Sequence, residues 1–253
     1  MIFSTGLTIF LISLSLFTAF LSGIAGMAGG MVLMGAMIWV LPVSLAMILH
    51  GTTQLVSNGY RAFLHRQHII FNILGYYILG LVAVLIIFQI LSVTVSRPVV
   101  FIALGALPLI AYIPKRVFHV DILKKKDAFI CGCMVTFLQL TAGVSGSALD
   151  IFFLNRNLTR HQVIATKALT QSLGHLTKLY YFGLILKIES DADFSAIPAV
   201  LIPGLTLMTL VGTTLSKSIL KRISDHQFHT GTRLLVTCIG LIYLWKGINL
   251  LLQ

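Results

Sequence analysis

The stretch "HGTTQLVSNGYR" (residues 50–61) decides the fold, because it puts polar side chains into a chain that is otherwise apolar. Four of them recur at intervals of three or four residues: His50, Gln54, Asn58 and Arg61. Residues at this spacing share one face of an α-helix, so the stretch predicts a helix with a polar stripe. The stretch "KALTQSLGHLTK" (residues 167–178) carries polar residues at the same relative positions. Two such stripes indicate surroundings other than lipid.

The composition is that of an integral membrane protein. Of the 253 residues, 57% are hydrophobic and only 10% are charged, whereas soluble domains are about 45–50% apolar and about 25% charged. The net charge of +11 would suggest nucleic acid in a soluble protein. Here basic cytoplasmic loops explain it, and we expect the lipid bilayer, not nucleic acid, as a partner. The N-terminus has no basic region before its apolar run, so we expect no cleaved signal peptide.

Apolar runs and helix-breaking residues predict helices at 4–24, 30–41, 44–64, 71–92, 98–116, 128–143, 146–156, 161–182, 196–216 and 232–251. The segments 30–41 and 146–156 reach only roughly 17 Å at 1.5 Å per residue, too short for a hydrocarbon core of about 30 Å. Each follows a run of small residues, "SGIAGMAGG" (22–30) or "TAGVSGSA" (141–148). This pattern predicts hairpins broken at glycines, with tight helix packing at the small residues as the alternative.

Loop charges predict the orientation of the chain. The linkers 114–127 and 216–233 are basic and therefore cytoplasmic, whereas the acidic linker 187–194 lies outside. A hairpin and one full span then connect the cytoplasmic linker at 127 to the outside at 187. The prediction is an all-α, polytopic membrane protein, a single transmembrane domain over residues 1–253. It comprises two inverted-topology repeats, about 4–116 and 127–251, each a glycine-broken hairpin plus about three transmembrane helices.

The two repeats predict where a substrate binds. Residues 20–61 align without a gap on 137–178, which matches two glycines of the breaks and a Thr-Gln pair in mid-span. Inverted repeats place substrates near the bilayer midplane, where broken helices meet, and polar side chains at that depth are functional candidates. The predicted substrate-binding residues are Gly26, Gly29, His50, Thr53, Gln54, Asn58, Gly143, Gly146, Lys167, Thr170, Gln171 and His175.

The residue types at this site favour a small anion. Lys167 and His50 would supply positive charge, hydroxyl and amide groups would supply hydrogen bonds, and helix N-termini after the breaks would add N–H donors. Arg61 and Lys178 are interpreted as side chains that snorkel to the interface, with a role in the site as the alternative. Asp150 either pairs with Lys167 or takes part in proton coupling.

Other chemistry is not indicated. His65 and His68, like His226 and His229, are three residues apart, but they lie in linkers, and we expect no metal site. The sequence has no P-loop, H-E-x-x-H or Ser-His-Asp pattern, so we expect neither an enzyme nor a cofactor.

The segments "GIAGMAGGMV" (23–32), "LPVSLAMILHGTTQLVSNGYRAFLHRQHI" (41–69) and "VIATKALTQSLGHLTKL" (163–179) resemble the TauE/SafE family, the sulfite exporter family of membrane proteins. The glycine triplet usual in that family is reduced to Gly29–Gly30 in the first repeat and to "GSA" in the second. The resemblance implies export of sulfite, a related sulfur oxyanion or an organosulfonate across the inner (plasma) membrane. A passive channel for anions or small solutes, and a membrane scaffold without transport, are the alternatives. A homodimer is compatible with the sequence but not required by it.

Overall fold

The structure is a computed structural model that describes residues 3–25, 28–114, 117, 119–154, 158–186, 197–220 and 225–253. In this part of the chain the regular structure is entirely helical, without a β-strand, which confirms the predicted all-α class. The α-helices are α1 (Thr5–Ala25), α2 (Ala28–Val40), α3 (Val43–Leu64), α4 (Leu74–Ile90), α5 (Arg97–Ala106), α6 (Lys125–Thr141), α7 (Gly146–Asp150), α8 (Arg160–Tyr180), α9 (Leu201–Leu220) and α10 (Asp225–Leu251).

Each predicted segment corresponds to one of these helices, and the differences lie at the helix ends. Helix α5 passes into a 3-10 turn at Leu107–Tyr112, where Pro108 lacks the N–H that an α-helix needs. Helix α7 is shorter than the predicted 146–156 and ends in a 3-10 turn at Ile151–Phe153. Helix α10 begins before residue 232, because the polar residues that we assigned to a linker continue the helix.

Several helices are built to face lipid. Those long and apolar enough to cross a membrane alone lie at Thr5–Ile24, Phe71–Ile90 and Gly231–Leu251. Large apolar side chains stand on the outside of the molecule, among them Leu79, which is 60% exposed, and Ile90, which is 76% exposed. Leaving such a surface in water would be unfavourable by roughly 25 cal/mol per Å². The chain is therefore a membrane protein.

Helices α3 and α8 have the opposite arrangement, with polar faces turned inward. The polar stripe of α3 is buried from His50 to Asn58, and that of α8 is buried at Thr170, His175 and Lys178. Apolar side chains of the same helices, such as Phe63 at 62% exposure, face outward. The two polar stripes of the sequence thus face the interior of the molecule and not lipid, as expected.

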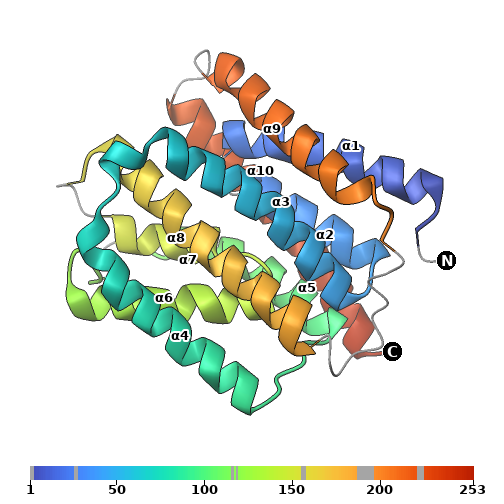
Figure 1. Cartoon of the computed structure of the whole chain (residues 1–253), viewed down its shortest axis with the longest axis horizontal. Helices are drawn as coiled ribbons and strands as arrows, with labels where there is room; N and C mark the ends of the chain where they lie inside the picture. The colour runs from blue at the N-terminus through green and yellow to red at the C-terminus, as the bar shows by residue number, and fades with distance from the viewer. Residues whose placement is uncertain are drawn as a thin grey trace.

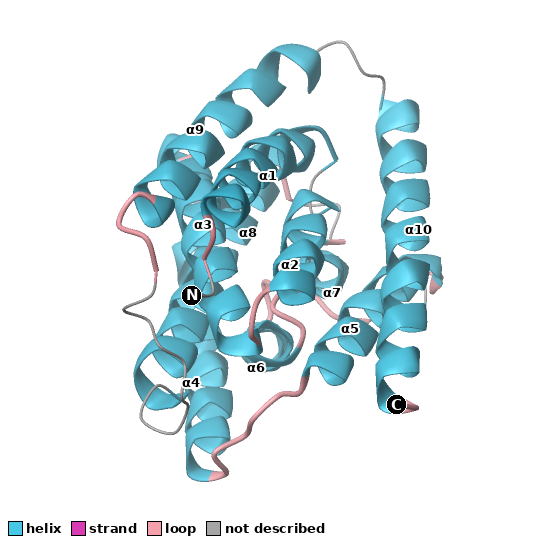
Figure 2. Cartoon of the chain, turned by 90° about the vertical axis from the view of Figure 1, so that its right-hand side faces the viewer, coloured by secondary structure: helices cyan, strands magenta, loops and turns pink. Residues whose placement is uncertain are grey.

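The two polar helices pack against each other in the middle of the molecule, and the other helices form pairs around them (Figure 1). Helix α1 packs on α9, α4 on α6, and α5 on α10, a set of pairs that Figure 2 shows from the end of the molecule. Glycines allow the close approach of α4 and α6. A methyl group at Gly80 would lie 2.9 Å from the Cys133 nitrogen, and one at Gly132 would lie 3.0 Å from the Leu81 nitrogen.

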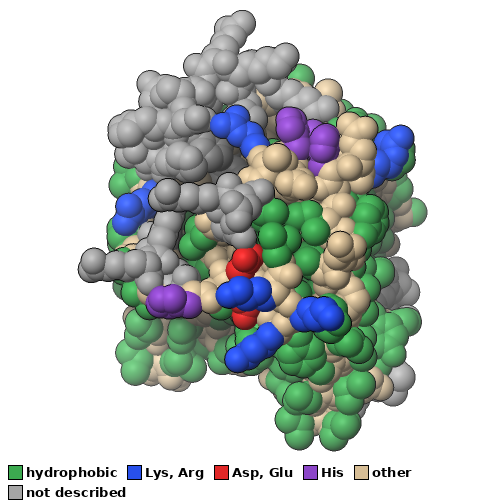
Figure 3. Space-filling view, turned by 90° about the vertical axis from the view of Figure 1, so that its left-hand side faces the viewer, with side chains coloured by type: hydrophobic (Ala, Val, Ile, Leu, Met, Phe, Trp, Pro, Cys, Tyr) green, Lys and Arg blue, Asp and Glu red, His purple; other side chains and the backbone are tan. Residues whose placement is uncertain are grey.

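Basic side chains gather at one end of the helices, which we call the basic face. The connection between α3 and α4 and the first residues of α6 and α8 lie there, at the left of Figure 1, opposite both chain termini. Figure 3 views this face and shows Lys, Arg and His side chains spread across it. This is the side that the loop charges predict to be cytoplasmic. The acidic linker 187–194, predicted to lie on the other side, is outside the described residues. The exposed cations of the basic face include Arg66, Lys124, Lys125, Lys126 and Arg160.

Candidate substrate site

The stripes of α3 and α8 face each other in antiparallel fashion. A methyl group at Gly51 would lie 3.0 Å from Leu179, whereas one at Gly59 would lie 4.0 Å from Ser172. Increasing residue numbers on α3 therefore meet decreasing numbers on α8. As a consequence, His50 near the start of α3 lies beside Lys178 near the end of α8.

His50 and Lys178 form the buried centre of the site. Both side chains are 0% exposed, and the Lys178 Nζ lies 2.8 Å from His50 Nδ1. Lys178 also donates to the carbonyl oxygen of Gly143 at 2.9 Å, and His50 Nε2 lies 3.0 Å from the carbonyl oxygen of Gly30. A carbonyl oxygen only accepts hydrogen bonds, so Nε2 carries the hydrogen and Nδ1 accepts from Lys178.

These four groups join the two glycine-containing breaks of the chain. Gly30 lies in the first turn of α2, and Gly143 lies between α6 and α7. The φ angle of Gly143 is +75°, and a methyl group there would lie 2.6 Å from the Met34 sulfur. Only glycine adopts this backbone without strain. The local chain path at Gly143 therefore aims its carbonyl oxygen at the Lys178 ammonium.

A second imidazole lies next to this pair. His175 is 3% exposed, and its ring centroid is 5.6 Å from that of His50. The Gln139 Nε2 donates to the Ser145 hydroxyl at 3.2 Å and lies 3.5 Å from His175 Nε2. The remaining polar atoms, His175 Nδ1 and Gln139 Oε1, are buried and have no hydrogen-bond partner. A buried unpaired polar group costs about 1–3 kcal/mol, so these atoms mark a place where a polar ligand would stabilise the protein.

The other predicted residues of α3 lie near this centre but differ in their hydrogen bonding. Gln54 is 8% exposed, and its Oε1 would be 3.4 Å from a methyl group at Gly30. Asn58 donates its side-chain amide to the Gln54 carbonyl oxygen. The Thr53 hydroxyl bonds the carbonyl oxygens of its own helix, at Leu49 and His50. Gln54 is therefore the α3 residue, besides His50, that is best placed to face a ligand near the first break.

The remaining predicted residues have mixed positions. Thr170 is buried but bonds the carbonyl oxygens of its own helix, and Gln171 is half-buried. Gly29 packs tightly against α1, and Gly146 is buried at the start of α7. Gly26 lies outside the described residues.

The structure places Lys178, and not Lys167, in the buried centre of the site, the reverse of what the sequence suggested. Lys167 forms an ion pair with Asp150 of α7, and the two side chains are 25% and 38% exposed, so Lys167 is not part of the buried centre. The pairing is one of the two alternatives predicted for Asp150. The interpretation of Lys178 as a snorkelling residue is wrong, because its ammonium is enclosed between His50 and Gly143.

Sequence reasoning missed Gln139 and Ser145 as parts of the site and gave Lys178 a role there only as the alternative to snorkelling. Lys178 could have been found from the predicted topology, since inverted repeats bring their equivalent helices together in antiparallel fashion. In that arrangement the end of the second stripe meets the start of the first. Gln139 is a polar residue in an apolar helix, one turn before the break at Gly143, and this position could have marked it as a candidate.

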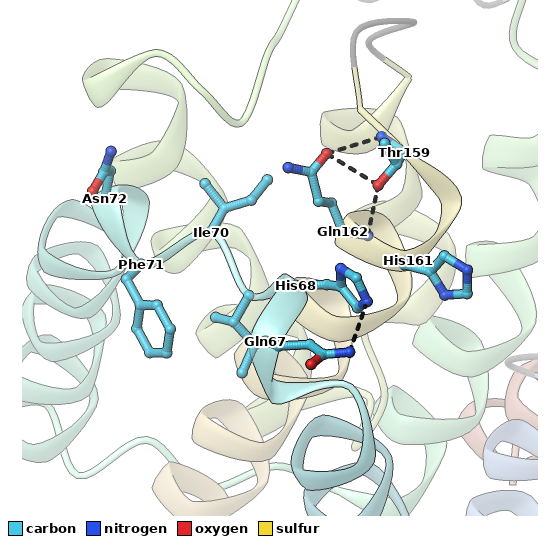
Figure 4. A pocket seen from close by; sticks show the side chains of 9 residues that line it. Gln67, His68, Ile70, Phe71, Asn72, Thr159, His161 and Gln162 are labelled. Atoms are coloured by element: carbon cyan, nitrogen blue, oxygen red, sulfur yellow. Dashed lines mark hydrogen bonds between the residues drawn. The ribbon is translucent and has the colours of Figure 1, made fainter.

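A separate cavity of about 520 Å³ lies at the basic face, between the α3–α4 connection and the start of α8 (Figure 4). His68 and His161 line it, with ring centroids 5.0 Å apart, and His65 lies 5.9 Å from His161. Over the described residues, no group of three or more His, Cys, Asp or Glu side chains is placed to hold a metal ion. The cavity is distinct from the buried centre, which lies further along α3 and α8.

The fold and the site together define a polytopic helical membrane protein with a buried basic centre between two polar helices and two glycine-containing breaks. A family model described as "Sulfite exporter TauE/SafE" matches residues 11–243. The chain belongs to this family of membrane transporters of sulfur anions, as its sequence resemblance indicated. Comparisons with curated proteins and with solved structures gave no significant match.

Proposed function

We propose that this protein transports a small anion, foremost sulfite or a related sulfur oxyanion or organosulfonate, out of the cell across the inner (plasma) membrane. It acts as an alternating-access carrier, not as an enzyme. The observation that carries the proposal is the enclosed Lys178 side chain, which lies at 0% exposure between His50 and the Gly143 carbonyl.

The charges around Lys178 favour an anion as the ligand. No described carboxylate lies within ion-pair distance of Lys178, since the ion pair found among the described side chains joins Lys167 to Asp150. An ammonium has three donors, and the contacts of Lys178 use two of them. A buried charge without an opposite charge costs several kcal/mol. A small oxyanion that accepts from the Lys178 ammonium would offset this cost and accept a further hydrogen bond from the Gln54 amide.

Helix packing supports two inverted repeats, α1–α5 and α6–α10. In this arrangement α1 corresponds to α6, and α9 corresponds to α4. The α1–α9 pair therefore corresponds to the α6–α4 pair, and the helices of both pairs are in contact. The α3–α8 and α5–α10 pairs exchange onto themselves, as helices on a pseudo-two-fold axis would. In transporters with this organisation, one repeat moves against the other around a fixed site.

The two ends of the α3–α8 pair differ in a way that suits alternating access. At the basic face, the Asp150–Lys167 pair is partly exposed, whereas His50 and Lys178 are enclosed. A centre sealed from both sides, with an ion pair between it and the cytoplasm, fits a carrier better than an open pore.

The test is sulfite flux into proteoliposomes that contain the purified full-length protein. We expect saturable sulfite uptake that competes with other sulfur oxyanions and falls at least about tenfold in Lys178→Met, equivalent to about 1.4 kcal/mol of lost binding. Lys126→Met is the matched control, because Lys126 is exposed at the start of α6; its flux should equal that of the wild type.

Three results would contradict the proposal. Undiminished saturable uptake in Lys178→Met would remove the basic centre as the site. Non-saturating conductance would favour the channel. Absence of flux for every oxyanion, together with a co-purifying membrane partner, would favour the scaffold.

A further inference from the structure

The hydrogen bonds of His50 limit how many protons the buried centre can hold without a ligand. Its Nε2 hydrogen is directed at the Gly30 carbonyl oxygen, so Nδ1 is the atom that faces Lys178 at 2.8 Å. If Lys178 is an ammonium, Nδ1 must be without hydrogen to accept from it. If His50 is an imidazolium, Lys178 must be a neutral amine. The pair therefore holds at most one positive charge in this geometry.

A second proton would place two N–H groups against each other with no acceptor between them. An oxyanion changes this situation, because one oxygen between His50 Nδ1 and Lys178 Nζ accepts from both and balances the added charge. The proton and the anion thus stabilise each other at the same place.

We propose that the His50–Lys178 pair is a proton-binding site that takes up about one proton with each bound anion, so that the two are transported together. This inference rests on the proposed function. It adds the co-transported ion and assigns it to a named pair of side chains.

Few other groups near the pair could bind this proton. Among the described residues, the titratable side chain in contact with His50, besides Lys178, is His175 on α8. The Tyr243 hydroxyl of α10 lies 3.4 Å from the carbonyl oxygen of Met31, the residue after Gly30. The nearby groups on α6 and its break are Gln139 and Ser145, which do not titrate at neutral pH. No described carboxylate contacts Lys178, so the balancing negative charge has to arrive with the ligand.

The experiment is isothermal titration calorimetry of the purified full-length protein with sulfite, thiosulfate and methanesulfonate. Titrations at one pH in buffers of different ionisation enthalpy give the protons taken up per bound anion. The variant His50→Gln keeps an amide donor for Gly30 and an oxygen acceptor for Lys178 but cannot titrate. His68→Gln, in the connection between α3 and α4, is the matched control.

We expect the wild type and His68→Gln to take up about one proton more per anion than His50→Gln. If His50→Gln binds none of the anions, the pH dependence of anion binding by the wild type decides the question. Its dissociation constant, measured at pH values above the ionisation of the probe, should rise about tenfold per pH unit, as linkage to one proton requires.

The outcomes separate the two proposals. Equal proton uptake in the wild type and His50→Gln, or a dissociation constant independent of pH, would overturn the proton site and leave the anion carrier standing. Failure of all three anions to bind the wild type would refute the proposed substrate class, and the coupling with it.

Discussion

Replacing Gly143 by alanine tests the construction of the second break most directly. Gly143 has a φ angle of +75°, and an added methyl group would lie 2.6 Å from the Met34 sulfur of α2. The substitution therefore combines a backbone penalty with a steric one. It also displaces the carbonyl oxygen that accepts from Lys178.

The expected loss of stability follows from these two parts. A non-glycine residue in the left-handed region costs about 1–2 kcal/mol, and overpacking costs about 1–3 kcal/mol. Alanine returns about 0.4–1 kcal/mol by restricting the unfolded chain. The net destabilisation is about 1–4.6 kcal/mol, or a Tm lowered by between about 2 and 18 °C for a chain of this size.

Thermal unfolding in detergent, followed by intrinsic fluorescence, measures this effect, with Gly75→Ala as the control. Gly75 lies on α4 with nothing within 4 Å of an added methyl group, so its Tm should stay equal or rise. A double-mutant cycle with Met34→Ala then isolates the steric part, because Met34→Ala should cost about 0.5–3 kcal/mol less in the Gly143→Ala variant than in the wild type. If Gly143→Ala proves as harmless as Gly75→Ala, the reasoning about this break is wrong. Equal cost of Met34→Ala in both backgrounds would leave backbone strain as the whole cause.

Two further changes test the packing and the ion pair in the same unfolding assay. Gly132→Leu should destabilise the protein by at least about 1–3 kcal/mol, because its side chain would enter the backbone of α4; an unchanged Tm would show that α4 and α6 separate without loss. Asp150→Asn should cost less than about 1 kcal/mol, since Asp150 and Lys167 are both partly exposed; a loss above about 3 kcal/mol would identify the pair as part of a buried network.

The helices were predictable because their lengths and apolar runs are local properties of the sequence. The segment 44–64 became α3 (Val43–Leu64) almost unchanged, since a stripe at helical spacing specifies both the helix and its inward face. The break near Gly143 was also predictable. Glycine has a low helix propensity and adopts positive φ angles without strain, so a run of small residues that contains Gly143 and Gly146 favours a break between two helices.

The partners of the charged side chains were not predictable from local pattern. Lys167 and Lys178 lie on one helix and differ little in sequence context, yet one pairs with Asp150 near the basic face and the other is enclosed. What separates them is the antiparallel packing of α3 on α8, a long-range property. The sequence alignment paired His50 with Lys167 as equivalent positions, but equivalent positions in antiparallel helices lie at opposite ends.

The hydrogen bonds from Gly30 through His50 and Lys178 to Gly143 form one continuous connection between the two halves of the chain. Gly30 and His50 belong to the first half, and Lys178 and Gly143 belong to the second, so the bond between His50 and Lys178 is the link across the halves. A movement that separates α3 from α8 at this level lengthens this bond. An anion bound between the same two nitrogens would replace the direct bond by a longer bridge through its oxygen. Occupancy of the site and the separation of the halves therefore depend on the same atoms, which is the relation that an alternating-access carrier requires between substrate binding and movement.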